Sequence, residues 1–409
     1  MKRNFREMLV VVVCLVLVTA FPVVSRQGEA AEATKGPIKI GHINTMTGAY
    51  AAFGEDSLHA IKIAVAEVNS KGGVLGRPLE VVSRDDMANP EKGLEAAKNL
   101  VLAEQVDYLV GVTSSAVAAA ISQFAKTQKV PFIISSAQAE DLTGKKGHRY
   151  IFRFSTNTNM YIYSDIQAAA KLPIKKWWLL NADYEYGHEC YNKFTKELKK
   201  LKPDVQFVGE SWPKLGTTDW MPYLAPIMAS DAEGLFLTVI ITKGLKAAGL
   251  FKKVTILGHD WGNIILLYPA REFIEDGMWG GTHYPFWLLK DNPQSAYLVR
   301  EYMKDRANPP GSGAAGVYAF VAALATGAKA TGSTDKEKII DWLEGRTLDT
   351  LVGPVTINAF DHQAQWPFWF GRTKTTPEYP SFPILVDTTK YQKEGYKTQE
   401  EVLKAREIN

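Results

Sequence analysis

The fold is decided by the stretch Ile38–Asp86, IKIGHINTMTGAYAAFGEDSLHAIKIAVAEVNSKGGVLGRPLEVVSRDD. Its first seven residues, Ile38–Asn44, predict a short strand. Apolar residues then recur at helical spacing, at Leu58, Ile61, Val65 and Val68. Gly72 and Gly73 end this helix, and Leu79–Arg84 predicts a second strand. A strand, a helix and a strand in this order indicate a parallel sheet covered by helices.

The same alternation continues along the chain and then restarts. The first unit continues through a helix, a strand, a helix and a strand, at Pro90–Ala103, Tyr108–Val112, Ala116–Lys126 and Pro131–Ser135. The second unit has strands at Trp177–Asn181, Gln206–Ser211, Leu235–Ile240 and Val254–Gly258, with a helix at Tyr191–Leu201. The tail contributes helices at Val317–Ala330 and Lys336–Glu344 and a strand at Val355–Ala359. We expect the tail to return to both units, so that the chain crosses between them more than once and forms a hinge beside a cleft.

Composition excludes several classes of protein. The chain has 409 residues, of which 46% are hydrophobic, and a formal net charge of +3. These values are ordinary for a globular protein of two to three domains and do not fit a multi-span membrane protein. The small charge argues against a nucleic-acid binder. Two cysteines exclude a disulfide scaffold, and Cys190 is expected to be a small core residue.

The N-terminus predicts export. A basic start (Lys2, Arg3, Arg6) precedes a short apolar run, Met8–Val18, and Ala31 and Ala33 follow in an Ala-x-Ala arrangement. This order is typical of a secretory signal peptide, here residues 1–33. We therefore expect a soluble protein in the periplasm.

The sequence lacks the motifs of common enzymes and cofactor sites. No G-x-G-x-x-G follows a strand, no Walker A motif or G-x-S-x-G elbow is present, and the seven histidines are scattered. Asp85 and Asp86 lie at a strand exit, where a turn or capping role is more common than catalysis. The sequence therefore predicts no cofactor and no metal, and an activity other than catalysis.

Two turns at predicted strand ends could hold an anion. Val112-Thr113-Ser114-Ser115 leads into a helix, whose first N–H groups are unpaired and carry a partial positive charge. Such a site holds a ligand carboxylate without lysine or arginine, although plain capping by serine is an equal alternative. The second turn, Ser135-Ser136-Ala137-Gln138-Ala139, could add hydroxyl and backbone donors.

The second unit offers an acid and aromatic residues at its strand ends. Tyr184–Gly187 follows one strand, and Gly258-His259-Asp260-Trp261 follows another. Asp260 could pair with a ligand cation, or it could cap a following helix. Tyrosine and tryptophan would cover an apolar part of the ligand.

These residues resemble a known family. The stretches Ile38–Asp56, Ile61–Asp86 and Gly249–Gly258, and the turn Val352-Gly353-Pro354-Val355, are similar to those of periplasmic branched-chain amino-acid-binding proteins. The resemblance implies the type I periplasmic binding fold, with two Rossmann-like doubly wound lobes joined by a multi-strand hinge. We expect a signal peptide at 1–33, an N-terminal lobe at 34–154 plus 283–354, and a C-terminal lobe at 155–282 plus 355–409.

The resemblance also assigns ligand-binding positions. It places Ser115 at the ligand carboxylate and Ala137 at a backbone contact, whereas Ser114 and Ala88 stand where the family has a cysteine pair. Ser114 and Gln138 are ligand-binding candidates because they belong to the two hydroxyl-rich turns. The resemblance places Phe53, Tyr186 and, less closely, Tyr318 around the apolar part of the ligand, and Trp261 is added because it follows a predicted strand end beside Asp260. Ala139 stands where the family has a threonine that bonds the amino and carboxylate groups, and Asp260 replaces a glutamate that neutralises the ammonium. The departure at Ala139 weakens the assignment of an amino acid. Asp260 is one methylene shorter than the glutamate, so a ligand cation would have to lie deeper or be bridged by water.

The implied function is solute capture for transport. Such a protein closes its lobes on a small carboxylate, a branched-chain or other apolar amino acid, and passes it to the permease subunits of an ABC importer, as a monomer. Only about 13 residues separate the strand ending at Ile240 from the next at Val254, so a helix over Ile241–Leu250 would be short and the pocket wider. An aromatic or aliphatic carboxylic acid or an amide is the alternative ligand, and a ligand-sensing subunit is the alternative role.

Overall fold

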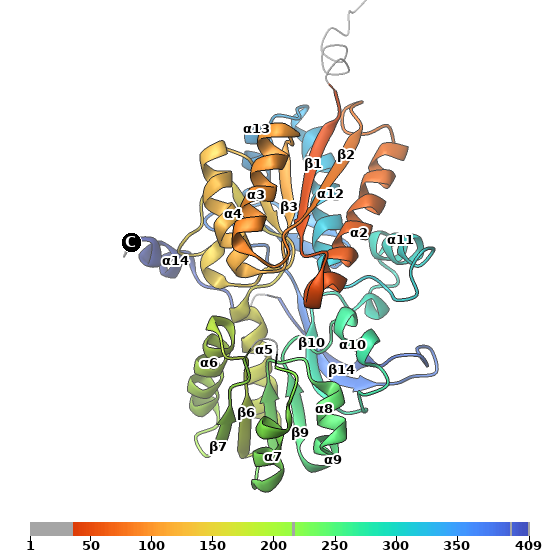
Figure 1. Cartoon of the computed structure of the whole chain (residues 1–409). Coiled ribbons are helices and arrows are strands. Elements are labelled where there is room, and N and C mark those ends of the chain that lie inside the picture. Colours follow the sequence, from red (N-terminus) through yellow and green to blue (C-terminus); the bar gives the residue numbers. More distant parts are fainter. Residues whose placement is uncertain (1–35, 215–216, 393–394, 408–409) are drawn as a thin grey trace, which may run out of the picture.

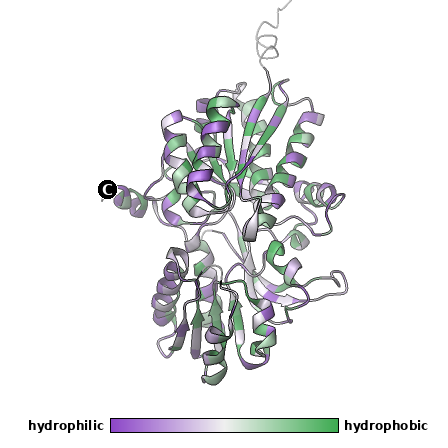
Figure 2. Cartoon of the chain, in the orientation of Figure 1, coloured by the Kyte–Doolittle hydropathy of each residue, from purple (hydrophilic) through white to green (hydrophobic). Residues whose placement is uncertain are grey.

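The computed structural model describes residues 36–214, 217–392 and 395–407, and the predicted signal peptide, residues 1–33, lies outside them. Strands in the described part of the chain form two main sheets, which lie one above the other in Figure 1. In Figure 2 these strands are mostly hydrophobic, whereas the helix α6 (Glu185–Leu201) is largely hydrophilic. The predicted α/β fold class is confirmed.

The first sheet has the strand order β2-β1-β3-β4-β5 and is parallel throughout. Its strands are β1 (Ile38–Asn44), β2 (Leu79–Asp85), β3 (Tyr108–Gly111), β4 (Phe132–Ile134) and β5 (Ile151–Arg153). Its helices are α2 (Ala51–Ser70), α3 (Pro90–Lys98) and α4 (Ser115–Gln128), with short turns η1 (Gly48–Tyr50), η2 (Asn99–Ala103) and η3 (Glu140–Leu142). Every carboxyl end in this sheet therefore points to the same edge.

Local sequence explains where these elements begin and end. Asn89 caps α3 by accepting hydrogen bonds from the backbone N–H groups of Glu91 and Lys92, and Pro90 starts the helix. Gly73, in the turn after α2, has a φ of +75°, and a Cβ there would lie 2.2 Å from the Arg77 carbonyl oxygen. The predicted turn at Gly72–Gly76 therefore requires glycine at this position.

The second sheet has the order β14-β13-β10-β9-β8-β6-β7. Its strands are β6 (Lys176–Leu180), β7 (Gln206–Ser211), β8 (Gly234–Leu237), β9 (Thr255–Gly258), β10 (Trp279–Thr282), β13 (Phe368–Lys374) and β14 (Ile384–Tyr391). Its helices are α5 (Thr158–Lys171), α6, α7 (Met221–Ala229), α8 (Thr242–Ala247), α9 (Leu250–Lys253) and α10 (Ile264–Ala270). Only β13 and β14 join antiparallel to their neighbours, so the remaining strands again share one carboxyl edge.

The long tail packs partly on the first sheet. It contains η4 (Phe286–Leu288), α11 (Pro293–Tyr302), α12 (Ser312–Thr331), α13 (Lys336–Leu343), the hairpin β11 (Thr347–Thr350) and β12 (Gly353–Thr356), and α14 (Gln399–Glu407). Asp56 of α2 accepts hydrogen bonds from the Tyr302 hydroxyl and from the backbone N–H groups of Gly311 and Ala314. By length and composition α12 could cross a membrane, but 72% of its apolar window is buried within the fold, so it is a core helix.

Three chain segments cross between the two sheets and hydrogen-bond to one another. The backbone N–H of Arg153 donates to the His362 carbonyl, and that of Ala364 donates to the Arg153 carbonyl. The side chain of Gln363 donates to the Ser155 carbonyl, and the Trp366 indole donates to the His283 carbonyl. The multi-strand hinge between two lobes is therefore present.

Several elements differ from the sequence prediction. The short helix predicted over Ile241–Leu250 is present as α8 but ends at Ala247, because Gly249 with a φ of +72° separates it from the next short helix, α9. The helix predicted from Tyr191 begins at Glu185, and the one predicted from Val317 begins at Ser312. The lobe boundaries stay a prediction. The last helix, α14, contacts the first unit, where Arg406 donates to the carbonyls of Thr143 and Gly144.

Candidate functional site

The predicted hydroxyl turn lies at the carboxyl ends of β3 and β4. Ser114 is the N-cap of α4, and its hydroxyl oxygen accepts a hydrogen bond from the Val117 N–H at 3.5 Å. The Ser115 hydroxyl oxygen accepts one from the Ala139 N–H at 3.1 Å. A hydroxyl that accepts in this way keeps its own proton free to donate. The two serine turns predicted from sequence are thus joined, and α4 directs its N-terminus toward the same edge.

A buried arginine holds the second turn in place. The guanidinium of Arg153 at the end of β5 is fully buried, and it donates to the carbonyl oxygens of Ala137 at 3.1 Å and Ala139 at 2.5 Å. It also donates to the Gln363 side chain in the hinge at 2.8 Å. Because Ala137 and Ala139 act here through their backbone, small side chains at these positions leave the arginine room.

Helix α5 connects the two halves of the site. At its start, the N–H and hydroxyl of Thr158 donate to the Gln138 carbonyl at 3.0 and 3.2 Å. One helical turn later, about 5 Å along the axis, the Tyr161 hydroxyl donates to Asp260 Oδ1 at 2.9 Å. The serine turns and Asp260 are therefore parts of one region beside the hinge.

Asp260 is a strained and electrostatically unusual residue. It follows β9 with a φ of +59°, in the left-handed region that aspartate tolerates better than most residues. Burial, only partly offset by His259 and by hydrogen bonds from Tyr161 and Asn263, raises the pKa of its carboxyl to about 7. The capping alternative for Asp260 is wrong, because α10 is capped by Asn263. Asp260 is thus available to a ligand, as a neutral acid or as an anion near neutral pH.

Aromatic side chains from both lobes meet near the site. The rings of Tyr184 and Tyr186 stack at 5.7 Å, and the Tyr186 ring lies 5.7 Å from that of His259. The Tyr184 hydroxyl interacts with that of Tyr50 on the first lobe, and the Tyr50 ring lies 6.3 Å from that of Phe53. The predicted positions Phe53 and Tyr186 are therefore linked across the two lobes through Tyr50 and Tyr184.

Two predicted wall residues lie elsewhere. Trp261 is 1% exposed and packs in the apolar core of the second lobe beside Gly258 and Leu237, so it supports the site from beneath. Tyr318 is buried on α12, and its hydroxyl donates to Glu67 at 2.5 Å. Glu67 lies fourteen residues beyond Phe53 on α2, about 21 Å along the helix.

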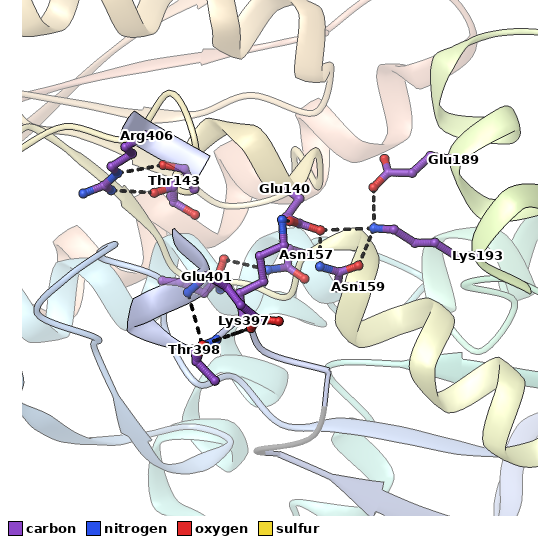
Figure 3. Close-up of polar contacts among 12 residues, drawn as sticks. Glu140, Thr143, Asn157, Asn159, Glu189, Lys193, Lys397, Thr398, Glu401 and Arg406 are labelled. Atoms are coloured by element: carbon purple, nitrogen blue, oxygen red, sulfur yellow. Dashed lines mark hydrogen bonds and ion pairs between the residues drawn. The ribbon is translucent and has the colours of Figure 1, made fainter. Parts of the chain in front are cut away.

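A cluster of charges also joins the lobes, and Figure 3 shows its members converging on Glu140. Lys193 of α6 donates to Glu140 at 3.1 Å and to Glu189 at 2.6 Å, and Lys397 of the tail pairs with Glu140 as well. Burial pushes the pKa of the Glu140 carboxyl upward, but Lys193 and Lys397 outweigh it and hold that pKa below its usual range. The Asn159 amide donates to Glu140 and accepts from Lys193. We call Glu140, Asn159, Lys193 and Lys397 the inter-lobe ion cluster.

The sequence analysis missed several of these residues. Tyr161, Arg153 and Glu140 carry the contacts across the site, yet none lies in a motif. Asp85 and Asp86 do serve the turn role that was expected, since their carboxylates accept hydrogen bonds from Met46, Thr45 and neighbouring groups. In the described residues, no group of three histidine, cysteine or acidic side chains could hold a metal. An open depression of about 400 Å³ lies between α2 and β2, and no candidate site residue lines it.

The family follows from comparison with known proteins. A model described as "Periplasmic binding protein" matches residues 37–377, most of the chain. The chain belongs to the periplasmic binding protein family. Among curated members, the Leu/Ile/Val-binding protein homolog 4 of Brucella abortus is 25% identical over 359 residues, which cover 83% of this chain and 84% of that protein.

Solved periplasmic binding proteins share the fold. A solute-binding protein of an ABC transporter from Rhodopseudomonas palustris, in complex with 3,4-dihydroxybenzoic acid, matches with a TM-score of 0.77 and 22% identity. The match covers 88% of this chain and 98% of that one. An amino-acid ABC transporter substrate-binding protein from Pseudomonas fluorescens matches with a TM-score of 0.78 and 20% identity, covering 90% and 98%. The predicted type I periplasmic binding fold is thereby confirmed.

Proposed function

We propose that this chain is exported to the periplasm, where as a monomer it captures a small carboxylate between its lobes and delivers it to the permease subunits of an ABC importer. No bond is made or broken in this role. Closure is favoured because the ligand contacts both lobes, so that binding shifts the population toward the closed form.

The proposal is carried by the junction of the serine turns at the start of α4. The Ser115 hydroxyl proton is free to donate, and the first turn of a helix presents N–H groups without intrahelical partners. A carboxylate suits this site because anions are stabilised at helix N-termini. Arg153 supports the neighbouring turn by donating to the carbonyls of Ala137 and Ala139.

Two ligand classes fit this site to different degrees. A branched-chain or other apolar amino acid would place its ammonium at Asp260, as the name of the Brucella relative suggests. A carboxylic acid without an amine is the second candidate, and the bound acid in the Rhodopseudomonas protein supports it. It is favoured here because Asp260 already accepts a hydrogen bond from Tyr161 and because Ala139 offers no hydroxyl to an amine.

A thermal-shift panel of leucine, isoleucine, valine, benzoate, aliphatic acids and the matching amides tests the proposal. A ligand at 1,000 times its Kd adds about 4 kcal/mol to the free energy of unfolding. Ser115→Ala should weaken binding of the best acid by about ten- to hundredfold, the value of one charge-assisted hydrogen bond. The exposed Ser70→Ala on α2 is the matched control.

The result that overturns the proposal is preferential binding of amides over their acids, or an unchanged Kd in Ser115→Ala. Asp260→Asn separates the two ligand classes, since it should weaken an amino acid strongly and a simple acid little. Uptake by vesicles that contain the cognate permease distinguishes transport from a sensing role.

A further inference from the structure

A buried asparagine ends the second strand along the first sheet. Asn44 is the last residue of β1, and it is fully buried. Strand β1 pairs in parallel with β3, and Ile43 lies opposite Gly111, so Asn44 lies beside the segment that leads from β3 into α4. That segment contains Thr113 and, two residues later, Ser115, which holds the carboxylate in the proposed function.

The backbone fixes the orientation of the Asn44 amide. The N–H of Thr45 donates to Asn44 Oδ1 at 2.9 Å, and because a backbone N–H can only donate, the amide oxygen must face it. The Thr113 hydroxyl lies 2.9 Å from the same oxygen and therefore donates to it as well. On the other side, Asn44 Nδ2 donates to Ser57 Oγ at 2.9 Å. The direction of every bond follows without choosing a protonation state.

The bond to Ser57 connects Asn44 to the start of helix α2. Ser57 is fully buried, and its hydroxyl donates to the Gly54 carbonyl at 3.1 Å. Gly54 follows Phe53, and a Cβ at Gly54 would lie 2.0 Å from the Thr45 carbonyl oxygen, so the start of α2 packs directly on the segment after β1. Asn44 therefore joins the helix start that carries Phe53 to the turn before α4.

The turn between β3 and α4 has a strained backbone. Gly111 has a φ of +124° and Val112 a φ of +68°. A β-branched residue rarely adopts this left-handed conformation, which persists only where the surrounding structure holds it. The Val112 N–H donates to the Ile43 carbonyl at 2.8 Å, and its carbonyl accepts from the Ala137 N–H at 3.0 Å. Thr113 is the next residue, so its hydroxyl bond anchors the chain directly after the strain.

We propose that Asn44 is a positioning residue for ligand capture. Through Thr113 it holds the strained turn in the conformation that directs Ser115 and the start of α4 toward the carboxylate. Through Ser57 it fixes this turn relative to Phe53. Asn44 is buried, and it acts on the ligand only through these neighbours. This inference rests on the proposed carboxylate site and deepens it, because it names the residue that keeps the site in place before the ligand arrives.

The first test measures Kd by isothermal titration calorimetry with benzoate and with leucine, two probes that share a carboxylate. Thr113→Val keeps the shape of the side chain but removes its hydroxyl, and it should weaken each probe that binds by about three- to tenfold, the value of one neutral hydrogen bond. Thr113→Ser keeps the hydroxyl and should restore the parent Kd to within about twofold. Thr127→Val, at an exposed position of α4, is the matched control.

Double variants show whether the effect passes through the residues named. In a Ser115→Ala background, Thr113→Val should weaken binding by less than about twofold, because the hydroxyl that it positions is gone. Asn44→Ala combined with Thr113→Val should bind no more weakly than Asn44→Ala alone, since both remove the same bond. The measurements on Thr113→Val do not depend on whether Asn44→Ala folds.

The second test needs no ligand. The Ala139 N–H is bonded to Ser115 Oγ and the Ala137 N–H to the Val112 carbonyl, so the two amides report on the turn. Hydrogen exchange followed by mass spectrometry should be about threefold or more faster at residues 137–139 in Thr113→Val, and unchanged in α6 of the other lobe.

Three outcomes overturn the positioning role alone: an unchanged Kd in Thr113→Val, unchanged exchange at residues 137–139, or a full effect of Thr113→Val in the Ser115→Ala background. The last result would mean that Thr113 contacts the ligand itself. If neither probe binds, or if Ser115→Ala leaves Kd unchanged, the carboxylate site is overturned instead. The exchange measurement then decides by itself whether Asn44 holds the turn.

Discussion

Arg153→Lys should destabilise the first lobe far more than the same exchange at a surface position. Arg153 is fully buried and donates to the carbonyls of Ala137 and Ala139 and to the side chain of Gln363. A lysine keeps the charge but presents a single ammonium at the end of a flexible stem, which cannot reproduce the planar fork of a guanidinium. The substitution therefore keeps the positive charge at position 153 but loses the hydrogen-bonding geometry of the guanidinium.

The magnitude follows from the number of bonds lost. Arg153 also donates a longer hydrogen bond to the Thr143 hydroxyl at 3.5 Å, and a single ammonium in this position can keep about one of the three shorter contacts. Each hydrogen bond to a charged donor contributes about 1.5–3 kcal/mol, so the loss of two gives about 3–6 kcal/mol. That is a large part of the roughly 5–15 kcal/mol by which a typical domain is stable.

Urea unfolding followed by circular dichroism measures this loss. Arg300→Lys is the matched control, because Arg300 is exposed on α11 and pairs with its neighbour Glu301. The midpoint should fall in Arg153→Lys without a change in the slope, whereas the control should stay within about 0.5 kcal/mol of the parent. A loss below 1 kcal/mol in Arg153→Lys would refute the claim that this side chain holds the turn of Ala137 and Ala139 in place.

Three further predictions concern the cleft. Lys193→Gln breaks the inter-lobe ion cluster at a partly exposed contact and should weaken ligand binding about two- to fivefold. It should also favour the open form, which increases the radius of gyration measured by small-angle X-ray scattering, and an unchanged scattering profile contradicts this. Because the raised pKa of Asp260, about 7, means that its carboxyl must lose a proton to pair with an ammonium, leucine affinity should rise with pH up to about 7 and then level off. Benzoate affinity should not rise in this way, and a flat leucine profile removes Asp260 from the amine site. Tyr318→Phe should cost about 1 kcal/mol of stability through the lost bond to Glu67 and leave ligand affinity within twofold, whereas a tenfold loss would return Tyr318 to the site.

Much of the fold could be predicted because its signals are local. The strand, helix and strand of Ile38–Asp86 and the glycine turn between them depend on periodicity and backbone conformation alone. Helix α5 was missed because Tyr161 and Asp165 are buried polar positions, which hide the apolar stripe that marks a helix. The separation of α8 from α9 depends on a single glycine, Gly249, and the pattern of a short stretch of sequence does not show whether one glycine ends a helix.

The candidate site could be predicted only where it follows from strand ends. The Ser114–Ser115 turn and Asp260 could be proposed from sequence because parallel strands bring their carboxyl ends to one edge. Tyr161 could not be found in this way, since its partner Asp260 is 99 residues away in the chain. The structure places Trp261 and Tyr318 in packed cores instead. The sequence could not show this, because a large aromatic residue near a strand end or in a core helix serves packing as often as it serves ligand binding.

The attachment of the chain's end has a practical consequence for labelling this molecule. Arg406 donates hydrogen bonds to the carbonyls of Thr143 and Gly144 in one lobe. Lys397, earlier in the same segment, pairs with Glu140, and Lys193 of the other lobe donates to Glu140 as well. Residues 397–407 therefore connect the two lobes across the hinge. A reporter or purification tag fused after these residues would strain this connection and change how readily the two lobes open. A fluorescent sensor built on this protein should therefore carry its dye elsewhere.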